Sequence, residues 1–233
     1  MSSEKRLAIL QSNYIPWKGY FDLIDSVDEF IIFDDAQYTK NDWRNRNRIK
    51  TAQGVQWLTI PVETKGKLSQ RIGEAEVKGD VWREKHLRSI VQNYSRTRYF
   101  SGYKSWLEQL YNTCDSRLLS KINYHFLAAI CKELNITTKL TWSSDYHVGE
   151  EKTERLVSLC RQAGATTYLS GPSARSYIDP ALFEEAGITL LFKEYVYPEY
   201  PQLYPPFDHA VTVLDVILNT GPDARLYIIG KTE

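Results

Sequence analysis

The chain has 233 residues, and its 42% hydrophobic and 25% charged content is that of a globular protein that can bury a large core. Basic and acidic residues are equal at 29 each, so no overall field draws the chain to nucleic acid or to a membrane surface. The N-terminal apolar run is too short for a signal peptide, and no stretch is long enough to span a bilayer. We therefore expect a cytoplasmic protein.

The aromatic residues and cysteines say little about which ligand or metal ion the protein binds. The 16 tyrosines and six tryptophans fit stacked ligands and a tyrosine-rich core equally well. Cys114, Cys131 and Cys160 lie in apolar helical patterns without the spacing of metal ligands. Buried free thiols are therefore the preferred interpretation, and we predict no metal site.

Apolar runs and turn residues predict an alternating order of strands and helices. The first part should contain strands at 7–10 and 29–33, a helix beginning at 17–24, a hairpin of 45–49 and 57–62, and a short strand at 68–77. Residues 81 to about 134 have helical periodicity. The remainder should contain strands at 138–142, 167–170 and 189–192, and helices at 151–163, 181–186 and 211–218.

This order predicts one α/β domain spanning residues 1–233. Strands followed by helices form right-handed crossovers, which build a three-layer, largely parallel, Rossmann-like sheet. The hairpin and the helical segment at about 81–134 then enter as additions between the two halves of the sheet.

The first candidate site is an elbow at residues 11–19, where the first strand gives way to a helix. Ligands in open parallel sheets bind beyond the carboxyl ends of strands, where a helix presents unpaired N–H groups to a phosphate or carboxylate. Gly19 would allow a ligand to approach the backbone closely. An ordinary helix start, with proline in its first turn and an aromatic staple, fits equally well.

The second candidate site follows the second strand, where two carboxylates precede a run of arginines. Paired carboxylates can accept a proton or hold a metal ion, and the guanidinium groups can bind phosphate or carboxylate. In a strand over 45–49, Arg44, Arg46 and Arg48 project from one face, and Asn45 and Asn47 from the other. A solvated hairpin with surface ion pairs is the alternative.

The third candidate site is the Ser-Gly-Pro-Ser-Ala-Arg segment beginning at Ser170. Small residues and hydroxyls after a strand can wrap an anion, with Arg175 one turn further on. A strand-to-helix turn that simply requires glycine and proline is an equal alternative. A later segment, residues 198–207, is rich in proline and tyrosine, and we expect it to be exposed as a lid or as a subunit contact in a homodimer.

Several motifs in order resemble the WbqC-like proteins: QSNYIPWKGYFDLI, FDDAQYTKNDWRNRNRI, WLTIPV, TTYLSGPSARSYID, a late Tyr-Pro-Gln and LDVILNTG. The resemblance spans nearly the whole chain. It implies a role in making O-antigen or other surface polysaccharides, on an activated sugar. The family pattern usually has proline after the first glutamine, whereas Ser12 stands there in this chain.

A weaker resemblance, to pantothenate synthetase and related nucleotidyltransferases, implies a HUP-like form of the sheet. The SGPSARSYIDP segment is similar to the late Ser-Arg loop of that enzyme. Those enzymes bind phosphate with a His-x-Gly-His turn, which this elbow lacks. Asn13, Trp17 and the helix N-terminus would have to hold the phosphates instead.

Together these features predict an enzyme that transfers an acyl or aminoacyl group, such as glycine, to the amine of a nucleotide-linked aminodeoxy sugar. The partners would be that sugar and a small acyl or amino-acid donor; the cofactor is left open, with ATP and Mg²⁺ as candidates. The alternative is a non-catalytic nucleotide-sugar-binding or glycan-assembly module. The predicted catalytic residues are Asp34, Asp35 and Lys40. The predicted substrate-binding residues are Gln11, Asn13, Tyr14, Trp17, Gly19, Tyr38, Trp43, Arg44, Asn45, Arg46, Arg48, Ser170, Gly171, Ser173 and Arg175.

Overall fold

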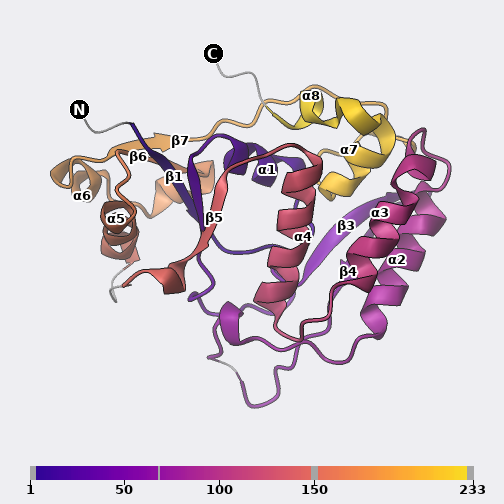
Figure 1. Cartoon of the computed structure of the whole chain (residues 1–233), viewed down its shortest axis with the longest axis horizontal. Coiled ribbons are helices and arrows are strands. Elements are labelled where there is room, and N and C mark those ends of the chain that lie inside the picture. The colour runs from indigo at the N-terminus through magenta and orange to yellow at the C-terminus, as the bar shows by residue number, and fades with distance from the viewer. Residues whose placement is uncertain (1–3, 68, 148–151, 230–233) are drawn as a thin grey trace.

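A computed structural model describes residues 4–67, 69–147 and 152–229, and a five-stranded parallel sheet lies in the left half of the molecule in Figure 1. The strand order is β5-β2-β1-β6-β7, and every neighbouring pair is parallel. The strands of this sheet are β1 (Arg6–Leu10), β2 (Glu29–Ile32), β5 (Lys139–Trp142), β6 (Thr167–Ser170) and β7 (Thr189–Phe192). These bounds confirm the predicted strands of the sheet to within one residue at either end.

Helices cover both faces of the sheet, which confirms the three-layer architecture (Figure 1). The α-helices are α1 (Lys18–Asp25), α2 (Val81–Tyr94), α3 (Phe100–Asn112), α4 (Leu119–Glu133), α5 (Lys152–Gln162), α6 (Pro180–Glu185), α7 (Val213–Thr220) and α8 (Ala224–Ile228). The 3₁₀ turns are η1 (Ile72–Glu74), η2 (Ser143–Asp145), η3 (Pro172–Ser176) and η4 (Gly221–Asp223). Helix α8 was not expected from the sequence.

Alternate residues of each strand enter different cores, as the period of two in a strand requires. Ala8, Phe30 and Ile32 belong to the larger core, which includes buried residues of α1, α4 and α7. Leu7 and Ile31 belong to the smaller core, with buried residues of α5 and α6. Because each central strand is buried on both faces, it reads as a continuous apolar run.

The order in which the chain adds strands to the sheet changes direction at the boundary between β1 and β6. From β1 it proceeds outward to β2 and β5, and it then returns on the other side to form β6 and β7. Strands β1 and β6 share only two residue pairs, Arg6 with Thr167 and Leu7 with Tyr168, whereas β1 and β2 share four. Pairing therefore stops before the carboxyl ends of β1 and β6. Such a reversal is where open α/β sheets bind ligands.

The insertion between β2 and β5 begins with the predicted hairpin, formed by antiparallel β3 (Arg46–Thr51) and β4 (Gly54–Thr59). The helical segment follows as α2, α3 and α4. The strand predicted at residues 68–77 is wrong: residue 68 lies outside the described residues, and the rest contains η1. Among the described residues, isolated bridges such as that of Val62 with Val77 pair this segment with distant residues, and none of the named strands lies beside it to extend it.

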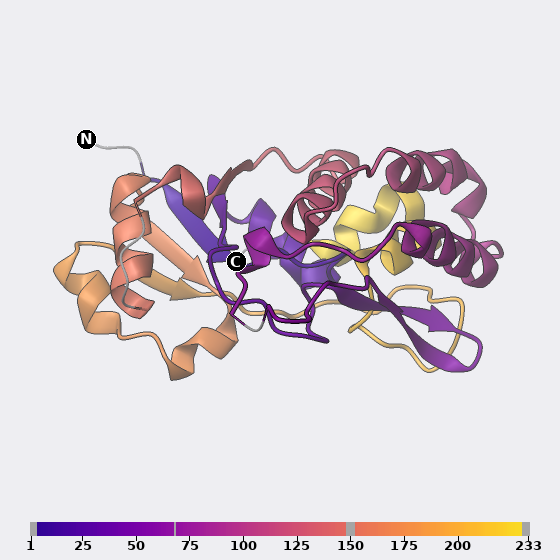
Figure 2. The same cartoon turned by 90° about the horizontal axis from the view of Figure 1, so that it is seen from below.

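Helix α6 lies at one end of the molecule and the hairpin lies toward the other end (Figures 1 and 2). Between them run residues 195–210, which we call the C-terminal segment and which form no helix or strand. The expectation that its proline- and tyrosine-rich part is exposed is wrong for Tyr200. The Tyr200 ring is buried because its hydroxyl donates to the buried Asp215 carboxylate at 2.8 Å.

The C-terminal segment is anchored by cations from the rest of the fold. The Lys18 ammonium is buried at 4.7 Å from the Tyr197 ring centre and 5.0 Å from that of Tyr200, and burial lowers the pKa of Lys18 to about 8. Lys50 donates to the Pro206 carbonyl.

All three cysteines are free and buried, as predicted. None of the described helices has the length and apolar character needed to cross a bilayer.

Candidate functional site

The elbow after β1 adopts a strained conformation that contacts from distant residues maintain. Ile15 has a φ of 35°, in the left-handed region that β-branched residues rarely occupy. The Asn47 amide donates to the carbonyls of Tyr14 at 3.1 Å and Ile15 at 2.9 Å, and the Tyr14 N–H donates to the Trp43 carbonyl at 3.0 Å. Strain of this kind persists only where the surroundings impose it, and it concentrates at functional sites.

Arg44 connects the elbow to the start of the hairpin. Its guanidinium donates to the side-chain oxygens of Gln11 and Asn13, both neutral amides. The nearest carboxylate, that of Asp42, lies 3.8 Å away, and only 16% of the Arg44 side chain is exposed. A half-buried guanidinium that is bonded mainly to neutral acceptors keeps positive charge available to an anion at this edge of the sheet.

The outer face of the hairpin carries the predicted arginines beside two tryptophans. Trp43 and Trp57 are each 41% exposed, and their ring centres lie 5.4 Å apart. The Arg46 guanidinium lies 4.1 Å from the Trp57 ring centre, and Arg48 lies within 6 Å of both rings. Asn45 and Asn47 are buried on the opposite face, so the predicted alternation of arginine and asparagine is confirmed.

Trp43 forms a wall of two cavities, which we call the elbow cavity and the arginine cavity. The elbow cavity, of about 260 Å³, is lined by Asn13, Pro16, Trp17, Trp43, Asn47 and Ala210. The arginine cavity, of about 310 Å³, is lined by Asn41, Asp42, Trp43, Arg46, Arg48 and Trp57. One cavity thus offers aromatic walls with two amides, and the other offers aromatic walls with two guanidinium groups and one carboxylate, that of Asp42, which leaves a net positive charge. Adjacent sites of this kind suit a ligand with a ring at one end and phosphates at the other.

The predicted carboxylates follow β2 but line neither of these two cavities. Asp34 is buried, and its oxygens accept hydrogen bonds from the Ser12 N–H at 2.8 Å and from the Ser120 hydroxyl. Burial raises the pKa of the Asp34 carboxyl, although these hydrogen bonds oppose the shift. Asp35 is half-buried, and its carboxylate accepts a hydrogen bond from the Ser143 hydroxyl at 2.5 Å. The Arg71 guanidinium forms an ion pair with the same carboxylate at 3.4 Å. Lys40 is exposed.

Four of the predicted binding residues of the first two candidate sites are buried inside the fold. The Tyr14 ring is fully buried, and its hydroxyl bonds with His86 at 3.0 Å and Tyr111 at 2.7 Å. Tyr38 is buried, and burial raises its pKa to about 12. The Asn45 amide donates to the Ile60 carbonyl. A side chain at Gly19 would meet the Trp17 ring at 2.3 Å, so this glycine makes room for Trp17.

The Ser-Gly-Pro-Ser segment lies at the carboxyl end of β6 and contributes to neither cavity. Ser170 is buried, whereas Ser173 and Arg175 are exposed in η3, and Gly171 is half-buried. Arg175 lies 4.4 Å from the Phe192 ring centre. The structure therefore brings Asn13, Trp17, Trp43, Arg46 and Arg48 around two adjoining cavities, and it places the third candidate site apart from their walls.

Sequence reasoning missed five residues that line these cavities: Asn41, Asp42, Asn47, Trp57 and Ala210. Trp57 faces Trp43 across the hairpin, because β4 pairs it with Arg48. Asn47 and Ala210 line the elbow cavity from β3 and from the C-terminal segment. Leu58, the neighbour of Trp57 in β4, is buried, so the period of two in a strand could have placed Trp57 on the outer face. Nothing local indicates that Ala210 returns to this point. Among the described residues, no cluster of His, Cys, Asp and Glu could hold a metal ion.

Comparison with known proteins places this chain within a recognised family. The model of the WbqC-like protein family matches residues 11–227. The chain is 50% identical over 225 residues to the uncharacterized protein Rv1507c of Mycobacterium tuberculosis strain H37Rv, covering 96% of this chain and 97% of the relative. No solved structure matches the chain. The chain therefore belongs to the WbqC-like protein family, whose membership indicates a role related to polysaccharide biosynthesis.

Proposed function

We propose that this protein is a cytoplasmic enzyme of surface-polysaccharide synthesis that transfers an acyl or aminoacyl group to the amine of a nucleotide-linked aminodeoxy sugar. The observation that carries this proposal is the Trp43 ring, which separates an aromatic, amide-lined cavity from an arginine-lined one. A nucleotide sugar has rings joined by a diphosphate, and so it matches both halves of the site.

The rings and the phosphates would each find a suitable partner. Aromatic side chains stack on bases and on the apolar faces of sugars, which suits Trp17, Trp43 and Trp57. Planar guanidinium groups bind phosphate oxygens in pairs. Arg48 donates twice to the Ala210 carbonyl, at 2.9 and 2.6 Å, and a phosphate oxygen is a stronger acceptor that can replace that neutral group.

The reaction would be an aminolysis of an activated acyl donor, such as a thioester, an ester or an acyl phosphate. The sugar nitrogen attacks the acyl carbon, a C–N bond forms, and the bond to the leaving group breaks with its electron pair on that group. The amine proton passes to a carboxylate. We assign this role to Asp35, because 26% of its side chain is exposed, whereas Asp34 is buried with both oxygens bonded inside the fold. The rate would come mainly from alignment and charge stabilisation.

A non-catalytic nucleotide-sugar-binding module is the second candidate. One observation favours it: none of Asp34, Asp35 and Lys40 lines the elbow cavity or the arginine cavity. Such a module would hold the activated sugar for other proteins of glycan assembly, and it would make and break no bond.

The decisive experiment incubates the protein with a dTDP-linked amino sugar, its hydroxy counterpart and a panel of activated donors, and detects acylated sugar by mass spectrometry. The enzyme hypothesis predicts product from the amino sugar alone. Asp35→Asn should abolish turnover and leave the dissociation constant of the sugar within about threefold. Asp80→Asn, an exposed carboxylate before α2, is the matched control and should retain full activity. Binding without product from any donor supports the module instead.

A further inference from the structure

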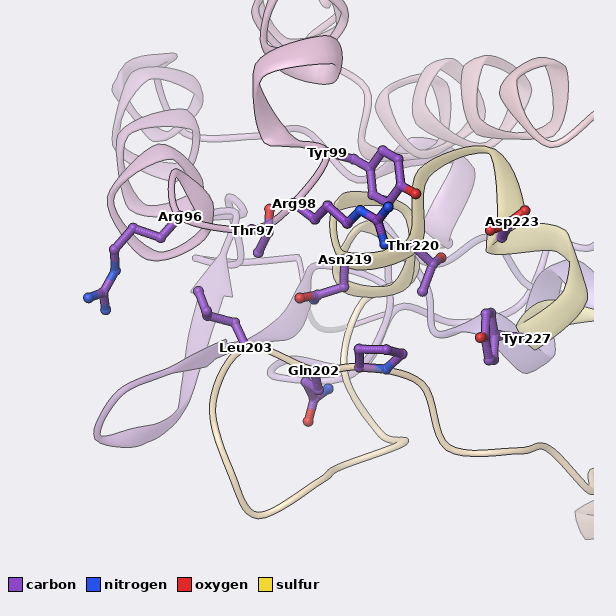
Figure 3. Close-up of a pocket in the computed structure, with 11 residues that line it drawn as sticks. Arg96, Thr97, Arg98, Tyr99, Gln202, Leu203, Asn219, Thr220, Asp223 and Tyr227 are labelled. Carbon is purple, nitrogen blue, oxygen red and sulfur yellow. The ribbon is translucent and has the colours of Figure 1, made fainter.

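A third cavity, separate from the two around Trp43, lies beside the C-terminal end of helix α7 (Figure 3). Its volume is about 290 Å³. The α2–α3 turn, the C-terminal segment and the α7–α8 region all contribute to it, so elements far apart in sequence converge there. Its lining residues are Arg96, Thr97, Arg98, Tyr99, Pro201, Gln202, Leu203, Asn219, Thr220, Asp223 and Tyr227.

The α2–α3 turn is fixed to the end of α7 by a close contact between Tyr99 and Gly221. Gly221 has a φ of 58°, and a side chain there would meet the Tyr99 ring at 2.4 Å. The Tyr99 N–H also donates to the Leu218 carbonyl at 3.2 Å. Arg98 lies over the Tyr99 ring, 5.2 Å from its centre. These contacts hold the turn that carries Arg98 against the end of α7, so the cavity is formed by packed elements of the fold.

The side chains of Arg96 and Arg98, the two arginines of the α2–α3 turn, point in different directions. Figure 3 shows the Arg98 side chain extending into the cavity toward Asn219 and Thr220, whereas Arg96 extends away from it. Arg96 donates to the Tyr204 hydroxyl at 3.1 Å. Within the described part of the chain, Arg98 forms no ion pair with a carboxylate. The cavity therefore contains one guanidinium group that is available to a ligand.

Negative charge is present in the same cavity. Asp223 is exposed and lines it, and Figure 3 shows Asp223 on the side away from Arg96. The C-terminal end of α7, at Asn219 and Thr220, adds the negative pole of the helix dipole. A purely anionic ligand such as phosphate would be repelled by these groups, and a purely cationic one would be repelled by Arg98.

The remaining lining suits a small polar molecule with a short apolar part. Asn219 and Thr220 are buried at the cavity and carry polar side chains, while Tyr99, Tyr227 and Pro201 provide apolar surface. The Asn219 amide nitrogen is committed to the Asp215 carbonyl at 2.8 Å, which fixes the orientation of its side chain.

We propose that this cavity binds a free α-amino acid as its zwitterion. The α-carboxylate pairs with the Arg98 guanidinium, and the α-ammonium group is held by Asp223 and the carbonyl end of α7. A ligand with both charges is the class that the opposed charges of the cavity recognise best. The proposal goes beyond the transferase function and does not depend on it, because it concerns binding alone.

Calorimetric titration of the whole protein with glycine, L-alanine and L-serine tests the proposal. At least one of them should bind, whereas N-acetylglycine and glycinamide, which each lack one charge, should bind at least about tenfold more weakly than glycine. Arg98→Gln should weaken the same binding about tenfold or more, and Arg96→Gln, the matched control, should change it by less than about twofold. Asp223→Asn should also weaken it.

Three results would overturn the proposal. These are no binding of any of the three amino acids up to about 10 mM, equal binding of N-acetylglycine and glycine, or unchanged binding by Arg98→Gln. Thermal unfolding of Arg98→Gln serves as the folding control, and we expect its midpoint to match that of the parent because Arg98 is exposed. Since the titration contains no nucleotide sugar, its outcome is independent of the transferase proposal.

Discussion

The elbow after β1 and the Ser-Gly-Pro-Ser turn after β6 occupy equivalent positions at the carboxyl ends of neighbouring strands, yet they are built differently. The elbow is bonded to residues from the hairpin and from α2 and α3. The later turn relies on local hydrogen bonds, such as that from the Ser176 hydroxyl to the Ser173 carbonyl at 3.1 Å. Two stretches with similarly suggestive composition thus differ in how firmly the fold positions them, and we place the ligand at the firmly held one.

The largest expected effect concerns the stability of the elbow. Asn47→Ala removes the amide that donates to the Tyr14 and Ile15 carbonyls, and it leaves both carbonyls without that hydrogen bond. The substitution should therefore lower the free energy of unfolding by about 3 kcal/mol. Ser176→Ala in the later turn should change it by about 0.5 kcal/mol or less. Urea denaturation measures both values. Equal losses would show that the two segments are held equally.

The second prediction uses His86, which contacts the Tyr14 hydroxyl beneath the elbow. Burial lowers the pKa of His86 to about 4, from an ordinary value of 6.5. The unfolded chain therefore takes up a proton at higher pH than the native protein, and stability is lost as the pH falls from 6.5 to 4. The slope due to His86 should reach about 1.4 kcal/mol per pH unit.

His86→Gln should remove that slope, while His147→Gln, at an exposed histidine after β5, should keep it. Unfolding free energies measured by urea denaturation across this pH range provide the test. If the two variants retain the same slope, the protonation of His86 does not differ between the native and unfolded states, and His86 does not cause the loss of stability at low pH.

The third prediction concerns affinity for a dTDP-linked amino sugar. Removing the Trp57 ring takes away a wall of the arginine cavity and the surface on which Arg46 lies. Trp57→Ala should raise the dissociation constant about 30-fold, the loss typical of a buried aromatic contact. Tyr177→Ala removes a ring that is 64% exposed after η3, and it should have no measurable effect. Weaker binding by Tyr177→Ala together with unchanged binding by Trp57→Ala would place the sugar at the turn after β6 instead.

The smallest effect compares arginines of the two regions. Arg46→Gln should weaken binding of the same sugar about tenfold and reduce its dependence on salt, because it removes one charge from the phosphate site. Arg175→Gln, in η3, should alter neither quantity by more than about twofold. Titrations at low and high ionic strength separate these outcomes, and a stronger effect at Arg175 would contradict the assignment.

Much of the fold was predictable because its signals are local. Strand β2 reads as an apolar run since both of its faces are buried, and the hairpin shows its period of two in the alternation of Arg44 to Arg48. The extended segment before α2 misled us because its partners, Val62 and Leu118, are remote in sequence. Composition alone cannot indicate where such isolated bridges will form.

The site was only partly predictable for the same reason. Trp43, Arg46 and Arg48 were found because they lie close together in sequence. Tyr14 was expected at a ligand, but its hydroxyl meets His86 and Tyr111, which lie on two helices whose packing no local pattern reveals. The adjacent carboxylates Asp34 and Asp35 looked like a pair, yet they bond to different partners from α4 and η2.

The most direct test of the site is NMR of the six tryptophan indole N–H groups during titration with a dTDP-linked amino sugar. We predict that the signals of Trp17, Trp43 and Trp57 shift, since these rings line the two cavities. Trp82 and Trp106 line neither cavity and should remain in place. A shift confined to Trp142, which directly precedes the Ser143 partner of Asp35, would contradict our site and move the ligand to the β5 edge of the sheet.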